Sequence, residues 1–395
     1  MTARPAAGTS IHFLGDDAVL FHEPRQELHA FNTMAAVIWC HLEDGLDEIG
    51  IAARLAADFA LDPMLARRFV ADALADWASK GLLAGSVGPV HPPPPVAWHV
   101  PPGLPPWADV TFATSRDYCL AEQSFRLRCT DLAQDELLHP VFAHLADGPT
   151  TDSTDFAVVG HPGRIVVYRD RQPIGVCAEL EALAPLMYGL VWLALADRHG
   201  FFLDIHAGVL GTPEGCILLA APPGGGKSTL TAALMHAGFP YFSDEVALLD
   251  EADFHVTPFP MALCVKSFGV DPVAVLFPEV RNLPWHHRSD GKRVTYLPPP
   301  PGSLPPPGTR QKVRAVLFPR FEAGAATPCR EVSVMEALKL LVDQWVAISK
   351  RLEPRHIRAV VGWLGAIPCH ELVYGSTDAA IFAVRSLLQS KPDEK

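Results

Sequence analysis

A glycine-rich segment that follows a short apolar run constrains the fold of this chain more than any other feature. The apolar run, residues 216–221, has the length of a buried strand, and a helix pattern after the segment ends at Gly238. The segment itself consists of Gly224, Gly225, Gly226, Lys227, Ser228 and Thr229. Strand, glycine loop, Lys-Ser pair and helix are the parts of a phosphate-binding P-loop. Backbone N–H groups and the positive end of the helix dipole attract an anion, so we expect a nucleotide phosphate here rather than a glycine-rich turn that binds nothing.

The residues around this loop predict how ATP and Mg²⁺ would be held. Lys227 is expected to reach the β- and γ-phosphates, and Ser228 to bind Mg²⁺. Residues 239–249 predict a second strand, on which Asp244 and Glu245 follow the lysine by 17 and 18 positions. From that strand an acidic side chain can return beside the loop and share the metal with Ser228.

The loop departs from the usual P-loop pattern at its beginning. Ala221 stands where a glycine is common, and Pro222 and Pro223 provide no N–H donor. Five amides, from 224 to 228, remain and are sufficient for a phosphate.

Length and composition bound the class of protein. A chain of 395 residues predicts two or three domains. The net charge of −12 argues against a nucleic-acid partner, which would bind a basic face. The eight cysteines show no metal-ligand spacing, which is typical of buried thiols in a reducing compartment.

The sequence also predicts a cytoplasmic protein with no membrane partner. The first residues lack the apolar core of a signal peptide. The longest apolar run, residues 182–196, contains Pro185 and Gly189 and is too short and too broken to span a bilayer, so it predicts a core helix. The oligomeric state, a homo-oligomer included, stays open.

The N-terminal region predicts a small winged-helix-like module. Residues 18–31 alternate as two short strands would, with a turn at 24–26. Asn32 is a helix N-cap, a second helix is expected at 46–59, and a third starts at Asp62 before a proline. The next segment, 88–106, holds nine prolines in nineteen residues and predicts a stiff linker at a domain boundary; the alternative is a ligand for an SH3-like partner.

The N-terminal module resembles the PqqD family over roughly residues 11–83. The resemblance is carried by Phe31-Asn32, by Ala35, Ile38 and Trp39, by the sequence LDEI at 46–49 and by WASKGLL at 77–83. Members act as peptide chaperones in pyrroloquinoline quinone biosynthesis and, more widely, recognise leader peptides of ribosomally made peptides. In the family the leader adds as a strand beside the sheet and packs on the third helix. We expect Trp39 and Trp77 to be core residues rather than peptide contacts.

A second resemblance concerns the residues around the P-loop. Residues 107–172, with short apolar stretches such as 110–112, predict a β-rich region, and a helix follows at 178–198. By itself His206, between apolar neighbours, predicts a core histidine. However, His206 lies 21 residues before the loop lysine, in an Ile-His-x-Gly-Val-Leu segment, and the acidic pair follows the lysine. This arrangement resembles the HPr kinase/phosphorylase family and, more closely, the related kinases that accompany PqqD-like proteins.

This resemblance implies an α/β or α+β P-loop kinase domain of the HPr kinase (PEP carboxykinase-like) type. It implies that His206 lies near the phosphates, and that the acidic pair acts as metal ligand and as the base facing an acceptor hydroxyl. Asp244 matches the first acid and Glu245 the second, where HPr kinase has aspartate, so their division of labour stays open.

Two further cations are candidates for the nucleotide site. Lys266 lies in a segment that resembles the Pro-x-Pro…Lys segment of the related kinases; an exposed strand lysine is the alternative. Arg293 belongs to a basic stretch, residues 281–296, which is either a cap on the triphosphate or a solvated loop. Residues 298–307 should be irregular, and helices at 333–352, 354–364 and 377–388 should serve packing.

The combined interpretation is a PqqD-like peptide-binding domain at 1–87, a linker at 88–106 and a kinase domain at 107–395. It would phosphorylate a serine or threonine hydroxyl of a peptide or small protein, such as a ribosomally made precursor. The alternatives are a small-molecule kinase and a non-catalytic, nucleotide-switched peptide chaperone. The predicted catalytic residues are Lys227, Asp244, Glu245 and His206. The predicted nucleotide ligands are Gly224, Gly225, Gly226, Lys227, Ser228, Thr229, Lys266 and Arg293, and the predicted metal ligands are Ser228 and Asp244.

Overall fold

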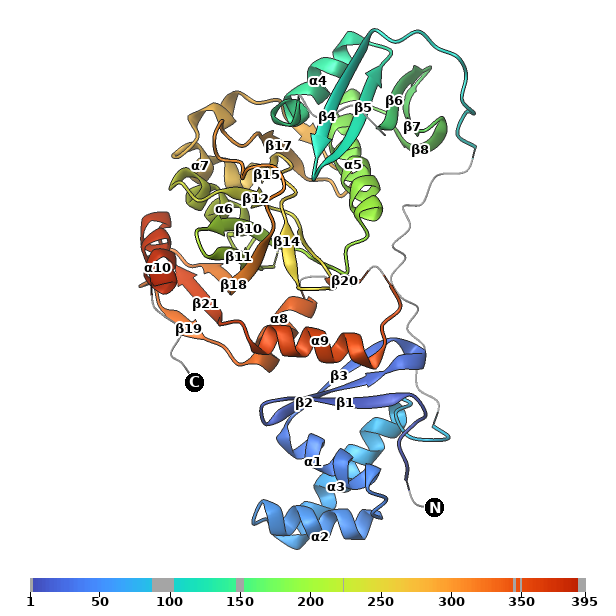
Figure 1. The fold of residues 1–395 in the computed structure, drawn as a ribbon, viewed down its shortest axis with the longest axis vertical. Coiled ribbons are helices and arrows are strands. Elements are labelled where there is room, and N and C mark those ends of the chain that lie inside the picture. The colour runs from blue at the N-terminus through green and yellow to red at the C-terminus, as the bar shows by residue number, and fades with distance from the viewer. Residues whose placement is uncertain are drawn as a thin grey trace. The chain divides into compact units, whose positions relative to one another are not determined.

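The structure is a computed structural model that describes residues 3–86, 103–146, 153–222, 224–343, 346–348 and 350–389. The chain forms two compact units (Figure 1). The first unit combines the N-terminal region with two segments from far along the chain, Ser333–Lys339 and Lys350–Ala366. The second unit contains Trp98–Val332, Leu340–Ser349 and Ile367–Lys395. The predicted linker at 88–106 lies outside the described residues except for its last four.

The first unit begins with an antiparallel sheet followed by three helices. The elements are β1 (Thr9–Leu14), β2 (Asp17–His22), β3 (Glu27–Phe31), α1 (Thr33–Glu43), α2 (Glu48–Asp58) and α3 (Pro63–Ser79). The strand order is β1-β2-β3, so β3 is an edge strand. The predicted pair of strands and the three helices are confirmed. β1 was not predicted, because its side chains show little contrast between buried and exposed positions.

Local chemistry explains where these helices start and how they pack. Asn32, Asp47 and Asp62 each accept a hydrogen bond from a backbone amide in the first turn of the helix that follows. Trp39 and Trp77 are buried, and the ring of Trp77 stacks on that of Phe31 with the centroids 5.0 Å apart. The prediction that both tryptophans are core residues is therefore confirmed.

The other face of the N-terminal sheet is covered by residues from the C-terminal half of the chain. The covering elements are α8 (Val334–Asp343) and α9 (Pro354–Gly365), and α9 lies along β1 (Figure 1). Met335 is buried with Leu14 and Val19, and Val361 packs against them. The side chain of Gln26 bonds both backbone polar groups of Leu352, at 2.6 and 3.0 Å. The first unit is therefore completed by residues that lie some 300 positions after the N-terminal sheet in the sequence.

The second unit opens with a five-stranded sheet of order β4-β5-β6-β7-β8. Its elements are β4 (Thr114–Leu120), β5 (Gln123–Cys129), α4 (Leu132–Phe142), β6 (Thr154–His161), β7 (Arg164–Arg169), β8 (Gln172–Cys177) and α5 (Leu183–His199). The β-rich prediction is confirmed, but α4 was missed. The apolar stretch 110–112 is not a strand; Val110 and Phe112 instead cover one sheet face beside Tyr168.

Helix α5 is the apolar helix that the sequence predicted. By length and composition the segment Leu180–His199 would be able to cross a membrane. In the structure Leu183, Met187, Leu190 and Val191 are buried in the core between this helix and the five-stranded sheet. The prediction of a core helix here is confirmed.

A larger mixed sheet forms the centre of the second unit. Its path is β12-β10-β11-β18-β14-β13-β9-β20, and β21 and β19 extend it beside β18. The strands are β9 (Leu203–Ile205), β10 (Gly208–Thr212), β11 (Gly215–Leu219), β12 (Tyr241–Ser243), β13 (Ala247–Leu249), β14 (His255–Thr257), β18 (Gln311–Phe321), β19 (Cys329–Glu331), β20 (Val346–Ile348) and β21 (Cys369–Tyr374). Because β11, β18 and β21 are parallel neighbours, their carboxyl ends meet at one edge of the sheet.

The predicted single strand at 239–249 is wrong in one respect: it breaks into β12 and β13 at Asp244-Glu245-Val246. The preceding ribbon breaks in the same way, between β9 and β10, at His206-Ala207. β12 pairs with β10 through Val209 and Ser243, and β13 pairs with β9 through Ile205 and Ala247. The two breaks therefore face each other.

Helices and a small sheet surround this centre. The helices are α6 (Lys227–His236), α7 (Val270–Ala274) and α10 (Thr377–Gln389). The small sheet contains β15 (Leu263–Lys266), β17 (Arg293–Leu297) and β16 (His286–His287), in that order. The predicted helices at 354–364 and 377–388 and the irregular stretch at 298–307 are confirmed. The predicted helix at 333–352 is too long, because the chain leaves α8 at residue 343 and forms β20.

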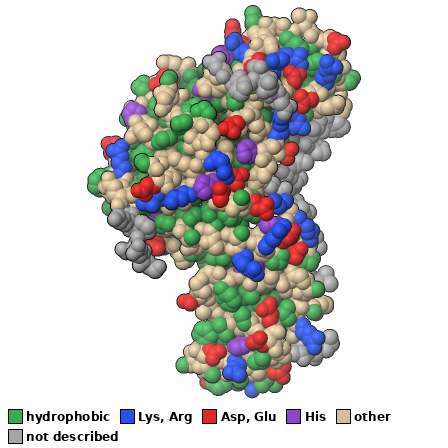
Figure 2. Space-filling view, in the orientation of Figure 1, with side chains coloured by type: hydrophobic (Ala, Val, Ile, Leu, Met, Phe, Trp, Pro, Cys, Tyr) green, Lys and Arg blue, Asp and Glu red, His purple; other side chains and the backbone are tan. Residues whose placement is uncertain are grey.

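Charges are mixed over the surface. In the space-filling view, Lys and Arg side chains are interspersed with Asp and Glu over the visible part of the described residues (Figure 2).

Candidate nucleotide-binding site

The glycine loop connects β11 to α6 and is held by the ends of the two neighbouring strands. The amide of Phe321, at the end of β18, donates to the carbonyl of Gly225 at 3.2 Å. The hydroxyl of Tyr374, at the end of β21, donates to the carbonyl of Gly226 at 3.0 Å. Gly226 has φ +92°, and a Cβ there would lie 2.3 Å from the Tyr374 hydroxyl. Glycine is therefore required at 226 by backbone conformation and by the close approach of Tyr374.

The first turn of α6 is joined to Asp244 by charge and hydrogen bonds. The Ser228 hydroxyl donates to Oδ2 of Asp244 at 2.8 Å. The ammonium of Lys227 donates to the backbone carbonyl of Asp244 and lies 3.6 Å from its Oδ1. The carboxylate of Asp244 is buried, and Oδ1 has no hydrogen-bond partner among the described residues. A buried carboxylate oxygen without a donor is costly unless a cation lies near it, as the ammonium of Lys227 does here.

The donor set fits a hard divalent metal such as Mg²⁺. Ser228 and Asp244 offer a hydroxyl and a carboxylate, the oxygen ligands that Mg²⁺ takes in phosphate sites. No group of three or more His, Cys, Asp or Glu side chains in the described part of the chain forms a metal site. A metal at Ser228 and Asp244 therefore depends on further oxygens, such as those of a nucleotide.

His206 and Glu245 occupy the two facing breaks in the sheet. Nδ1 of His206 lies 2.9 Å from the backbone carbonyl of Glu245 and 3.5 Å from its Oε2. Because a carbonyl only accepts, Nδ1 carries the proton and Nε2 keeps its lone pair. Burial, together with the nearby charge of Lys227, lowers the pKa of His206. His206 is thus a neutral side chain at the site and not an inert core residue.

Glu245 is surrounded by positive charge. Burial acts to raise its pKa, but nearby positive charge, that of Lys227 first and those of Lys266 and Arg288 after it, outweighs burial, and its pKa is lowered. About a quarter of its side chain is exposed, 27%, whereas that of Asp244 is fully covered. Glu245 is therefore a charged carboxylate that a ligand in the pocket can reach.

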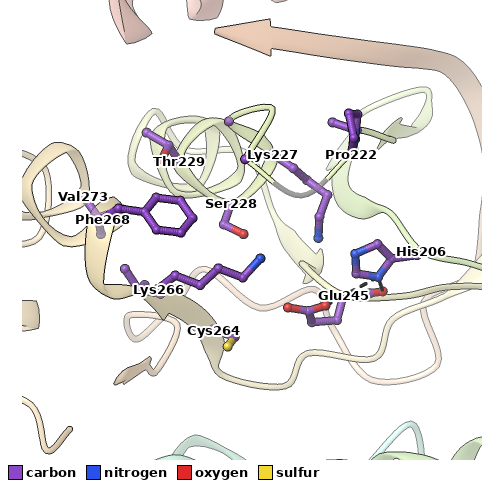
Figure 3. A pocket seen from close by; sticks show the side chains of 15 residues that line it. His206, Pro222, Lys227, Ser228, Thr229, Glu245, Cys264, Lys266, Phe268 and Val273 are labelled. Carbon is purple, nitrogen blue, oxygen red and sulfur yellow. Dashed lines mark hydrogen bonds and ion pairs between the residues drawn. The ribbon is translucent and has the colours of Figure 1, made fainter. Parts of the chain in front are cut away.

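These residues line one open pocket (Figure 3). Of the predicted site residues, it brings together His206, Gly224, Gly226, Lys227, Ser228, Thr229, Glu245 and Lys266. Gly225 and Asp244 lie directly behind this lining through the contacts given above.

Arg293, another predicted nucleotide ligand, is not among the side chains that line this pocket. Arg293 pairs with His287 across the β16–β17 hairpin, and its guanidinium lies over the ring of Trp285, 4.9 Å from the centroid. Arg288, from the same basic stretch, is the arginine whose charge acts on Glu245. Sequence reasoning also missed Phe268, which lines the pocket. Arg288 and Arg293 differ in where the β16–β17 hairpin places them. The basic composition of the stretch does not reveal these positions.

Comparison with known proteins identifies the N-terminal domain. Residues 17–83 match the family model "Coenzyme PQQ synthesis protein D (PqqD)". The chain therefore carries a PqqD domain at its N-terminus, as its sequence pattern predicted. No curated protein matches the chain.

Solved structures similar to this chain include two whose titles name a leader peptide. One is "TbiB1 in Complex with the TbiA(beta) Leader Peptide", with 24% identity and a TM-score of 0.20. The other is "Lasso peptide synthetase B1 complexed with the leader peptide", with 22% identity and a TM-score of 0.20. Each comparison covers 21% of this chain and 98% of the other.

Proposed function

We propose that this chain is an ATP-dependent kinase that phosphorylates a serine or threonine hydroxyl of a peptide bound by its PqqD domain. The proposal rests mainly on one observation. A predicted phosphate loop, a buried Ser228–Asp244 pair and the partly exposed carboxylate of Glu245 lie together at one pocket. A P-loop and a buried acid suffice for nucleotide binding. The additional exposed acid beside His206 favours transfer to a hydroxyl.

In this proposal the residues of the loop hold the donor. The amides from 224 to 228 bind the phosphate oxygens, and the ammonium of Lys227 neutralises charge that develops on the transferred group. Ser228 and Asp244 would hold Mg²⁺, which when bound neutralises the β- and γ-phosphates. Tyr374 and Phe321 fix the loop from behind, so little reorganisation accompanies binding.

We assign the base to Glu245 and not to Asp244. The carboxylate of Asp244 is covered and already accepts from Ser228. Glu245 is charged and partly exposed, so its oxygen can accept the proton of an acceptor hydroxyl. His206 donates to the backbone of Glu245 and thereby positions this residue in the break between β12 and β13.

The PqqD domain supplies the acceptor in this proposal. β3 is one of the two edge strands of its sheet, which leaves backbone groups for an added strand, as the family resemblance implies. Binding the leader segment there would raise the local concentration of the acceptor segment to about the millimolar range. The kinase site would then need only weak contacts of its own.

The experiment uses the full chain, Mg-ATP and candidate precursor peptides from neighbouring small open reading frames. Mass spectrometry should find one added phosphate on serine or threonine with the wild-type chain and none with Lys227→Ala. Transfer at wild-type rate by Lys227→Ala would refute the proposed site.

A peptide shortened by its leader separates this function from its alternatives. A peptide kinase should lose most of its activity when the leader is removed. The activity of a small-molecule kinase should not depend on the leader. Leader removal is preferable to deletion of the N-terminal domain, because deletion would expose the apolar residues of α8 and α9 that cover its sheet. Nucleotide-dependent peptide binding without transfer would instead favour the switched chaperone.

A further inference from the structure

The pocket has two chemically different ends. His206 and Glu245 lie at one end, with the ammonium of Lys227 directed toward them (Figure 3). Phe268 and Val273 lie at the other, beyond Ser228 and Thr229. One end is charged and the other is apolar.

The order of residues in a phosphate loop predicts which end of the pocket binds the γ-phosphate and which end binds the base. The lysine of such a loop reaches the β- and γ-phosphates. In this structure Lys227 is directed to the charged end, so the γ-phosphate belongs there. The α-phosphate, the sugar and the base then extend toward Thr229, which is where the apolar end begins.

Phe268 has the exposure and position of a ligand contact. It belongs to a short 3-10 helix, Ser267–Gly269, that follows directly on β15 and Lys266. Its side chain is 69% exposed although it lines a pocket, whereas Val273 beside it is buried. Its place in the wall of a concave pocket makes it a typical ligand contact, because ligand pockets are lined mainly by hydrophobic and aromatic side chains.

We infer that Phe268 is the platform on which the base of the nucleotide stacks, and that the site accepts adenine and guanine nucleotides alike. This inference rests on the proposed nucleotide-dependent function. An aromatic face stacks on any base, and purines offer the larger surface. Among the described residues that line the apolar end, Gly269 and Val273 carry no side-chain donor or acceptor to read a base edge. Stacking without edge recognition predicts little discrimination between purines.

The test measures dissociation constants, not turnover. The full chain is titrated by calorimetry with the magnesium complexes of ATP, GTP, CTP and inorganic tripolyphosphate, which has no base. Phe268→Ala should raise the dissociation constants of ATP and GTP by about 5- to 100-fold, which is the usual range for loss of a base stack. The dissociation constant of tripolyphosphate should stay unchanged. Phe268→Trp should retain purine affinity. Phe382→Ala is the matched control, because Phe382 is similarly exposed, at 74%, on α10 and does not line this pocket.

Each outcome addresses a different statement. Unchanged ATP affinity in Phe268→Ala, or an equal loss for ATP and tripolyphosphate, overturns base stacking. If the chain prefers ATP over GTP by more than about tenfold, the site reads the base edge, and that part of the inference is wrong. A wild-type chain that binds neither ATP nor tripolyphosphate overturns the proposed function itself, and with it this inference.

Discussion

The contact between Gly226 and Tyr374 allows the rigidity of the glycine loop to be tested in isolation. Gly224 and Gly226 have nearly the same backbone conformation, φ +91° and +92°, but a Cβ on Gly224 would meet no atom within 4 Å. A Cβ on Gly226 would lie 2.3 Å from the Tyr374 hydroxyl. Gly224→Ala therefore introduces backbone strain alone, and Gly226→Ala introduces the same strain plus a steric conflict.

The magnitudes follow from these two terms. Forcing a side chain into the left-handed region costs about 1–2 kcal/mol, which is the expected loss in the free energy of unfolding for Gly224→Ala. Overpacking adds about 1–3 kcal/mol, so Gly226→Ala should lose about 2–5 kcal/mol. Tyr374→Phe alone loses one hydrogen bond, about 1 kcal/mol. In that background the nearest atoms would still lie 3.2 Å from the added Cβ, which is a tight contact, so Gly226→Ala should cost less than in the wild type but more than Gly224→Ala.

The assay is denaturation in urea without nucleotide, so that ligand contacts do not enter. The four proteins of the Gly226/Tyr374 cycle and Gly224→Ala are compared through the transition of the second unit. Equal costs of Gly226→Ala in the two Tyr374 backgrounds would refute the argument that Tyr374 fixes the loop.

Two further predictions concern carboxyl groups. Glu245→Gln should lower kcat at least about a hundredfold while ATP affinity stays within about threefold. In the wild type, because the pKa of Glu245 is lowered from 4.5, the rate should fall only as pH drops below that value; an acid limb with its midpoint above pH 5.5 would place the base elsewhere. Burial raises the pKa of Asp204 to about 7, from 3.8, so the folded state retains a proton that the unfolded state releases, and stability falls as pH rises between these values. Asp204→Asn should therefore stabilise the protein at pH 8, by up to about 4 kcal/mol, and the gain should vanish as pH approaches 4, as denaturation at both pH values would show.

Features that depend on local order were predictable from sequence. Strand, glycine loop and helix lie within some 25 residues, so their spacing alone predicts the order of β11, loop and α6 that the structure contains. The caps Asn32 and Asp62 are equally local, since an N-cap binds amides two or three positions ahead.

Features that depend on pairing between distant strands were not predictable. By its neighbours alone His206 predicted a core residue; its place beside Glu245 follows from two strand breaks that pair across the sheet. Arg293 and Arg288 are indistinguishable in a basic stretch until the β16–β17 register directs one onto Trp285. The apolar face of α9 predicted that this helix would be packed, but it did not predict which surface the helix would pack on.

The docking of α8 and α9 on the N-terminal sheet has a consequence for synthesis. Translation delivers β1, β2 and β3 first, while Met335 and Val361, which cover one face of that sheet, are added some 300 residues later. At the usual rate of about 5–20 residues per second, the nascent sheet waits at least about 15 seconds with Leu14 and Val19 uncovered. A domain that stands first in the gene thus finishes folding among the last, and a chain that ends before Ser333 leaves the ribosome with an apolar sheet face exposed.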